Sequence, residues 1–308
     1  MFQRKLKALV VAVASLSATQ AIASDQITIE DIPNIEYVLQ SAISPSGDHI
    51  AFTRKLARKL YVDKDGANYS ELYISDTKGN ERPFITGKVN VKSLEWSADG
   101  QHVYFLGKFG KEKHTKLYRI PLSGGERQAV MALKDTSISA YDISPDGKQV
   151  ALLAMPAKEK SEKKLKDLGF KAEVYESGLK NKQLFVTELA VSEKPLSLDA
   201  IAIDTYVSDM NWSHDAKSML VKTQPTALID DTYTKSQWHV MDVASSKINL
   251  SIATEGKLNQ AEFSHDSDYI AIIGAEDKHD PAAGRLFMVD TDDGKVVDWL
   301  PNFKGHVS

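Results

Sequence analysis

Residues 141–153 read Tyr-Asp-Ile-Ser-Pro-Asp-Gly-Lys-Gln-Val-Ala-Leu-Leu. Pro145 fixes φ at the first corner of a turn, Asp146 can bond to its own backbone, and Gly147 accepts the left-handed conformation that follows. The apolar run at 150–153 is typical of a strand that is buried on both faces. This stretch therefore predicts a β-hairpin with a tight turn.

The same hairpin recurs along the chain, so that five copies are present. Their turn serines are Ser44, Ser97, Ser144, Ser213 and Ser264, at steps of 53, 47, 69 and 51 residues. A nearly constant period of about 50 residues is typical of a propeller or a solenoid. A large apolar residue precedes every turn serine and predicts an equivalent packing position in each repeat: Ile43, Trp96, Ile143, Trp212 and Phe263.

Each repeat also contains a second hairpin. Its first strand begins near Leu72, Leu117, Leu184, Trp238 and Leu286. Two hairpins per period give four strands, which is one propeller blade, and neighbouring blades must pack on each other to bury their faces. The sequence therefore predicts an all-β propeller of four-stranded blades, with five repeats present as an incomplete seven- or eight-bladed propeller.

The N-terminus has the pattern of a secretory signal peptide over residues 1–23. Arg4, Lys5 and Lys7 precede an apolar run, and Ala-Ile-Ala at 21–23 fits a cleavage site. The run is too short to span a membrane, although an uncleaved anchor is an alternative. We expect a periplasmic or secreted bacterial protein in which residues 24–308 form a partial propeller domain.

Charge and composition exclude several classes of partner and site. Without residues 1–23 the chain has 35 basic and 42 acidic residues, a net charge of −7, which argues against nucleic acid or an anionic membrane as partner. The absence of cysteine excludes disulfides and thiolate sites. No metal-binding, phosphate-binding or Gly-x-Ser-x-Gly motif occurs, so no cofactor, metal or catalytic residue is predicted.

Histidines give no repeated ligand spacing. His214 and His265 occupy the turn position that holds Pro45 and Pro145 in other repeats, so they are interpreted as turn residues. An enzymatic site in the central channel is also disfavoured, because no repeat position is expected to supply positioned acids or bases.

The third repeat carries an insertion at residues 156–182. The gap from its turn serine to its second hairpin is 40 residues, against 20–28 in the other repeats. Residues 158–168 contain eight charged residues among eleven and precede Gly169, which predicts a short exposed helix. An insertion into one loop of a regular array commonly marks a binding edge, and a decorative solvated helix is the equal alternative.

The end of the chain resembles the start of another repeat. Residues 302–308 look like the lead-in that precedes earlier turn serines, and a sixth turn serine is expected near positions 313–315. An unclosed propeller would expose two blade faces. We therefore expect the chain to be a fragment of a longer protein.

The Ser-Pro-Asp-Gly-Lys turn at 144–148 and its variants resemble the repeats of two groups of periplasmic propellers. One is the Tol-system propeller protein, and the other is the N-terminal propeller of the prolyl oligopeptidase family of serine peptidases. The segments 168–176 and 279–287 and the lead-in that ends at 44–47 resemble bacterial dipeptidyl- and acylaminoacyl-peptidase-like members of the second group. The resemblance covers residues 28–308.

The resemblance to the peptidases implies a peptide substrate and a C-terminal α/β-hydrolase domain with a Ser-Asp-His triad, which is missing from this chain. It implies a propeller that caps the active site and admits short peptides. In aminopeptidase-type members, glutamates on a propeller insertion bind the α-amino group of the substrate, and Glu173 and Glu176 are the matching candidates here. Solvated glutamates are the alternative for these two residues. The alternative function is a standalone Tol-like periplasmic propeller that acts as a protein-binding scaffold.

Overall fold

A computed structural model describes most of the chain after the first 26 residues. The predicted signal peptide at 1–23 lies outside the described residues. Among the described residues no helix is long and apolar enough to cross a membrane. The described residues are 27–29, 31–157, 159–170, 172, 176–192, 194–252, 254, 256–280 and 284–307.

The chain forms five consecutive antiparallel sheets, which we call blades 1 to 5. Blade 1 contains β1 (Val38–Ile43), β2 (His49–Leu56), β3 (Tyr69–Asp76) and β4 (Glu81–Ile85), and blade 2 contains β5 (Lys92–Trp96), β6 (His102–Gly107), β7 (Lys116–Pro121) and β8 (Gln128–Met131). Blade 3 contains β9 (Ile138–Ile143), β10 (Gln149–Ala154) and β11 (Gln183–Glu188). Blade 4 contains β12 (Tyr206–Trp212), β13 (Ser218–Gln224), β14 (Gln237–Asp242) and β15 (Lys247–Ile252), and blade 5 contains β16 (Leu258–Phe263), β17 (Tyr269–Gly274), β18 (Arg285–Asp290) and β19 (Val296–Asp298).

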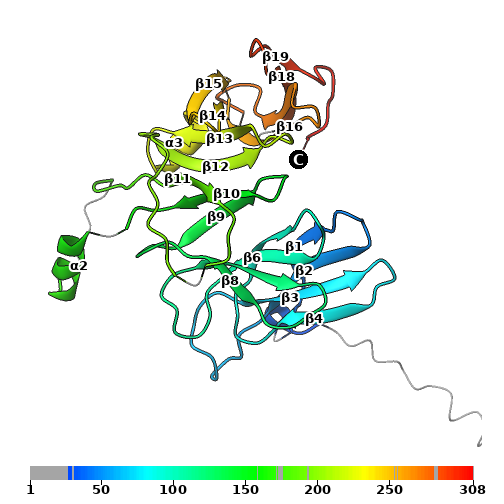
Figure 1. Cartoon of the computed structure of the whole chain (residues 1–308), viewed down its shortest axis with the longest axis vertical. Coiled ribbons are helices and arrows are strands. Elements are labelled where there is room, and N and C mark those ends of the chain that lie inside the picture. Colours follow the sequence, from blue (N-terminus) through cyan, green and yellow to red (C-terminus); the bar gives the residue numbers. More distant parts are fainter. Residues whose placement is uncertain are drawn as a thin grey trace, which may run out of the picture.

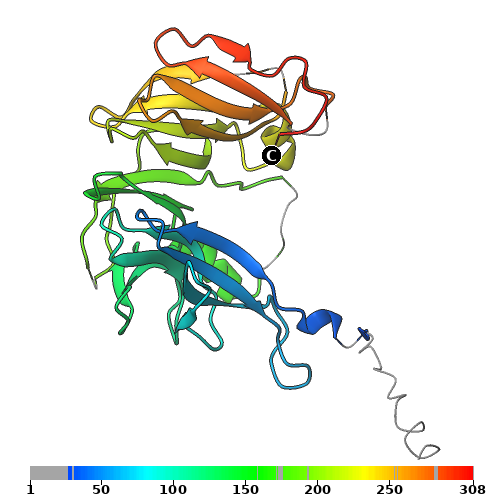
Figure 2. The same ribbon diagram turned by 90° about the vertical axis from the view of Figure 1, so that its right-hand side faces the viewer.

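The blades follow one another in chain order, from the blue blade 1 to the orange and red blade 5 (Figures 1 and 2). Within each blade the strands pair with their sequence neighbours, so that every sheet is a meander. The helical segments are short: η1 (Ile32–Asn34), α2 (Lys160–Asp167) and α3 (Ile229–Thr234). The prediction of an all-β propeller with five repeats is confirmed.

The turn serine organises the first hairpin of each blade. In blade 3, Ser144 Oγ accepts a hydrogen bond from the Gln149 backbone N–H at 2.9 Å and donates one to Asp146 Oδ1 at 2.7 Å. The same carboxylate accepts the backbone N–H of Lys148 at 3.1 Å. Gly147 has φ +69°, the left-handed conformation that the turn requires. The predicted hairpin is thus held by contacts that are entirely local in sequence.

Blades 4 and 5 place residues other than glycine at this left-handed position. Ala216 has φ +59° and Ser267 has φ +67°. A side chain in this conformation costs about 1–2 kcal/mol. The hydroxyl of Ser267 is in addition buried with no hydrogen-bond partner in the part of the chain that the structure describes. The turn of blade 5 is therefore strained in a way that the glycine turns are not.

Ser267→Gly should raise the free energy of unfolding by about 1 kcal/mol, because it removes the strain and the unpaired hydroxyl at the cost of backbone entropy. The matched change in the opposite direction, Gly147→Ala, should lower it by about 1 kcal/mol. Urea unfolding at equilibrium measures both variants. A loss of stability in Ser267→Gly would contradict the assignment of strain to this turn.

Four apolar clusters lie between the five blades. The cluster between blades 1 and 2 contains Leu72 and Phe105, and that between blades 2 and 3 contains Leu117 and Leu152. Blades 3 and 4 share a cluster around Trp212, and blades 4 and 5 share one in which β13 and β14 pack against β16 and β17. The expected packing between neighbouring blades is confirmed, because a four-stranded sheet buries its faces only against another sheet.

Blade 3 departs from the predicted four strands, because the described residues form three. The segment after β11 instead runs to the edge of blade 2. The backbone N–H of Ser192 donates to Val130 O at 2.9 Å, that of Leu196 donates to Ala132 O at 2.8 Å, and Leu196 O accepts from Lys134 N–H at 2.9 Å. Pro195 within this segment has no N–H to give to a regular antiparallel ladder.

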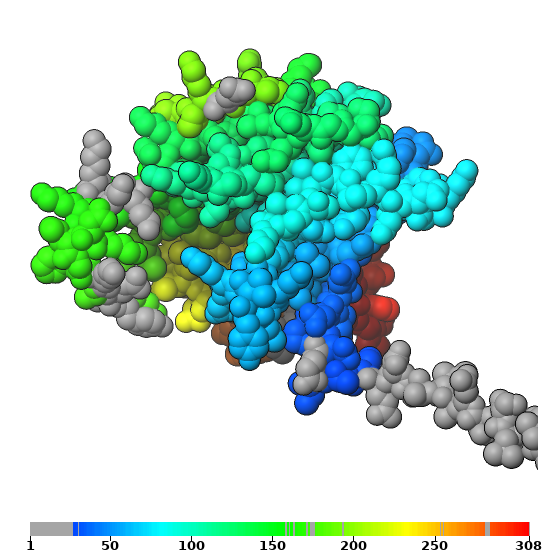
Figure 3. Space-filling model, turned by 90° about the horizontal axis from the view of Figure 1, so that it is seen from below, coloured from blue at the N-terminus to red at the C-terminus, as the bar shows by residue number. Residues whose placement is uncertain are grey.

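The insertion of blade 3 contains the predicted exposed helix as α2. The helix ends in a Schellman motif, in which the N–H of Phe170 bonds to Leu165 O at 3.0 Å and the N–H of Gly169 bonds to Lys166 O at 3.1 Å. Gly169 has φ +92°, as expected for the residue that stops the helix. The α2 helix stands out from the side of the molecule (Figures 1 and 3).

Candidate functional site

The first strands of several neighbouring blades contact one another. The strands β1 and β5, β9 and β12, and β12 and β16 lie next to one another. We call β1, β5, β9, β12 and β16 the inner wall. Its surface is where a propeller offers a central channel to a ligand.

Tryptophans that precede the turn serines bond across neighbouring blades of the inner wall. The indole N–H of Trp96 donates to Ala42 O at 2.9 Å, which joins blade 2 to blade 1. The indole N–H of Trp212 donates to Asp142 O at 3.0 Å, which joins blade 4 to blade 3. Both acceptors lie two residues before a turn serine, so the two bonds repeat the same geometry.

Carboxylates at that same repeat position also reach the next blade. Glu95 Oε1 accepts the backbone N–H of Ile143 at 3.3 Å, and Asp142 Oδ2 accepts the backbone N–H of Trp212 at 2.7 Å. Burial, together with the smaller effect of the Asp142 charge, raises the pKa of Glu95 to about 9 against the opposing effect of its bond from Ile143. Burial also raises the pKa of Asp142 to about 6, against the opposing effect of its bond from Trp212.

The expectation that no repeat position supplies positioned acids is therefore wrong. Glu95, Asp142 and Glu262 all stand two residues before a turn serine, and aligning the repeats would have revealed them. One carboxylate oxygen of Glu95 and one of Asp142 each accept a hydrogen bond from a backbone N–H of the next blade. These bonds join blade 2 to blade 3 and blade 3 to blade 4.

Two turns contain the residue types of a hydrolase triad in consecutive order, at 213–215 and 264–266. Ser213 Oγ donates to Asp215 Oδ1 at 2.7 Å and accepts the backbone N–H of Ser218 at 2.9 Å. Ser264 Oγ makes the same pair of bonds, to Asp266 Oδ1 at 2.6 Å and from the Tyr269 N–H at 3.0 Å. These serines hold their turns, and among the described residues neither is hydrogen-bonded to a histidine, which a triad requires.

The two predicted substrate-binding glutamates are only partly described. Glu173 lies outside the described residues. Glu176 is exposed, and its backbone has φ +56°, which lies in the left-handed region. The Lys180–Glu162 ion pair at 3.0 Å ties the returning segment to α2. The structure thus presents Glu176 to solvent on the insertion and leaves its role untested.

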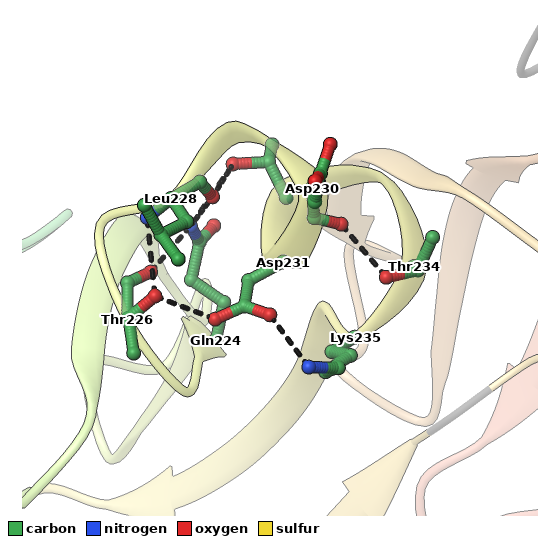
Figure 4. A network of polar contacts seen from close by, with 8 residues as sticks. Gln224, Thr226, Leu228, Asp230, Asp231, Thr234 and Lys235 are labelled. Carbon is green, nitrogen blue, oxygen red and sulfur yellow. Dashed lines mark hydrogen bonds and ion pairs between the residues drawn. The ribbon is translucent and has the colours of Figure 1, made fainter. Parts of the chain in front are cut away.

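A polar network builds the loop of blade 4 between β13 and β14 (Figure 4). The amide of Gln224 donates to Thr226 O at 2.8 Å, and Thr226 Oγ1 donates to Asp231 Oδ2 at 2.6 Å. Lys235 pairs with Asp231 at 2.9 Å. These bonds hold α3 over the end of the blade, and sequence reasoning missed them because no motif marks them.

A shallow depression of about 360 Å³ lies beside α3, between the loops of blades 4 and 5. Tyr233, Lys257, Lys278 and His279 are among its lining residues, and the Lys257 ammonium lies 4.4 Å from the centre of the Tyr233 ring. The lysines favour an anionic group such as a carboxylate. Within the described residues no group of three or more side chains could hold a metal ion.

Comparison with known proteins gives one family match. Residues 58–154 match the family described as the dipeptidyl peptidase IV (DPP IV) N-terminal region. A search of curated proteins gives no match. The matched residues run from the loop after β2 to the end of β10, so they span the end of blade 1, blade 2 and the first hairpin of blade 3.

Solved structures of three kinds share the fold. The acylaminoacyl peptidase of Pyrococcus horikoshii is 12% identical with a TM-score of 0.62, and the match covers 90% of this chain and 41% of that one. A prolyl endopeptidase is 14% identical with a TM-score of 0.58, and the match covers 88% of this chain and 37% of that one. A putative TolB from Agrobacterium tumefaciens is 14% identical with a TM-score of 0.53, and the match covers 85% of this chain and 80% of that one.

These likenesses establish the fold, and the chain spans about two fifths of the length of the two peptidases. The resemblance noted in the repeats is confirmed by the family match and by the peptidase propellers that share the fold. The chain accordingly has the β-propeller fold that these peptidases and the putative TolB share, and its residues 58–154 match the N-terminal region of dipeptidyl peptidase IV.

Proposed function

We propose that this chain is the substrate-gating propeller of an exported serine peptidase that acts on short peptides. The observation that carries the proposal is the match of residues 58–154 to the dipeptidyl peptidase IV N-terminal region. The catalytic triad would belong to a C-terminal α/β-hydrolase domain, and the propeller would restrict access to it. The predicted signal peptide at residues 1–23 supports export to the periplasm or the medium.

The loops between the blades offer charged groups to a peptide. Glu173 and Glu176 on the insertion are our candidates for the α-amino group of the substrate, and Glu176 is exposed as this role requires. The lysines beside α3 suit a carboxylate at the other end of a peptide or on its side chain. A short peptide with free ends carries both kinds of charge.

The mass and the reactivity of the protein that the source cells make test the proposal directly. An antibody raised against residues 24–308 should capture a protein larger than 34.0 kDa that reacts with a fluorophosphonate probe for active serines. In that full-length protein, Glu176→Gln should raise KM about tenfold for peptides with a free α-amino group and leave blocked peptides unchanged. Glu159→Gln, also exposed on the insertion, is the matched control.

A Tol-like scaffold is the second candidate, because the match covers 80% of the putative TolB, a protein of similar extent. In that case the captured protein would have the mass of this chain without its leader. It would not react with the fluorophosphonate and would bring envelope proteins with it. That outcome would overturn the peptidase proposal.

A further inference from the structure

Two histidines from different blades lie side by side at the seam between blades 4 and 5. Their ring centroids are 5.1 Å apart, and the ring planes are inclined by 56°. His214 follows the turn serine of blade 4, and His265 follows that of blade 5. Both are turn residues, as the sequence predicts, and both are exposed. The packing of the blades brings together two rings that are 51 positions apart in the chain.

The two turns hold the backbone of both histidines in place before any ligand arrives. Each turn is closed by a serine that bonds both to the aspartate two residues later and to the backbone N–H five residues later. The apolar cluster between blades 4 and 5 includes Phe263 and Leu220 and fixes one turn relative to the other. Preorganised ligands lose little conformational entropy on binding.

The separation of the rings matches a shared metal ion. Two imidazole nitrogens that bind one tetrahedral Zn²⁺ at about 2.0–2.1 Å place their ring centroids about 5 Å apart. Imidazole is also the commonest protein ligand for such ions. The equivalent turn positions of blades 1, 2 and 3 hold Pro45, Ala98 and Pro145, so the pair occurs at one seam of the described array.

We propose that His214 and His265 form a two-imidazole site for a divalent transition-metal ion, with Zn²⁺ as the ion that fits the observed separation. One oxygen of each neighbouring aspartate, Asp215 Oδ1 and Asp266 Oδ1, is engaged by a serine hydroxyl within its turn, so we assign the two imidazoles alone as protein ligands. Water fills the remaining coordination positions. Two protein ligands leave positions of a tetrahedral ion open to a ligand from a bound molecule.

The test is calorimetric titration of the untagged full-length chain with Zn²⁺. We expect one saturable site, and about tenfold weaker binding in His214→Asn and in His265→Asn. His102→Asn is the matched control, because His102 also lies just after a blade turn, and it should bind as the wild type does. The inference is independent of the proposed peptidase function.

The imidazole resonances give a second measurement, which identifies the histidines that bind the metal even if a variant binds weakly because its fold is disturbed. Zn²⁺ should shift the imidazole resonances of two of the eight histidines in the wild-type chain, and these two should be absent from the spectrum of His214→Asn/His265→Asn. Equal affinity in this double variant and the wild type would overturn the proposal. The absence of saturable binding below about 1 mM would also overturn it.

Discussion

Replacing Trp212 with alanine should lower the free energy of unfolding by about 3–5 kcal/mol, the range for loss of a large buried aromatic side chain. Trp212 is 5% exposed and belongs to the apolar cluster between blades 3 and 4. Its indole N–H also bonds to Asp142 O of blade 3 at 3.0 Å. The substitution leaves a cavity at a seam and an unpaired acceptor on the inner wall. Equilibrium unfolding in urea, followed by circular dichroism, measures the loss.

Trp212→Phe separates the two contributions of this side chain. Phenylalanine keeps most of the apolar volume and lacks the indole donor, so this variant should lose about 1–2 kcal/mol. Tyr269→Ala is the control for an aromatic side chain that is 46% exposed, and it should change stability by less than about 1 kcal/mol. A loss in Trp212→Ala no larger than in Tyr269→Ala would show that the seam between blades 3 and 4 contributes little to stability.

The sequence was informative where the structure depends on neighbouring residues. The turn at 144–148 is closed by bonds that span two to five positions, so its residue types alone specify it. The end of α2 depends likewise on Gly169 and the turn before it. Five such turns at a regular spacing were enough to predict the propeller, because a repeated hairpin has few other ways to bury its faces.

Contacts between blades were beyond the reach of sequence reasoning. Ile143 bonds to Glu95, 48 positions away, and Trp212 bonds to Asp142, 70 positions away. The fourth strand of blade 3 was predicted from the repeat, but Leu196 pairs with residues of blade 2 instead. Each of these features depends on how one blade sits against the next, which no local pattern encodes. Aligning the repeats would have shown that Glu95 and Asp142 share a position two residues before a turn serine, but it would not have shown their bonds to the next blade.

The inner-wall carboxylates make stability depend on pH. The pKa of Glu95 is raised to about 9 from an ordinary 4.5, and that of Asp142 to about 6 from 3.8. The folded state therefore holds protons that the unfolded state has released, and the free energy of unfolding falls as pH rises between the two values of each group. The stabilisation from each protonated carboxyl group is complete below the pKa of that group in the unfolded state. It is lost as pH rises to the pKa of the group in the folded state. The slope is at most about 1.4 kcal/mol per pH unit for each group.

Glu95→Gln should remove most of this dependence, because the amide is neutral at every pH and its oxygen can still accept the Ile143 N–H. We expect equal stability of variant and wild type near pH 5, and an advantage of about 2 kcal/mol for the variant at pH 8, since partial exposure to solvent reduces the full linkage value. For Asp142→Asn, the change in the free energy of unfolding with pH should differ from that of the wild type between about pH 4 and pH 6 and match it outside this range. Urea unfolding across pH 4–9 measures all three proteins.

Glu262→Gln is the matched control for Glu95→Gln. Glu262 occupies the same repeat position in blade 5 and is exposed, so it should follow the wild type at every pH. If Glu95→Gln also follows the wild type from pH 5 to pH 9, Glu95 is not held protonated by its place between blades 2 and 3. If the variant instead loses stability at every pH, the bond from Ile143 requires the carboxyl group itself, and the amide is no substitute. Only a difference that grows with pH supports a carboxyl group kept neutral by burial in the inner wall.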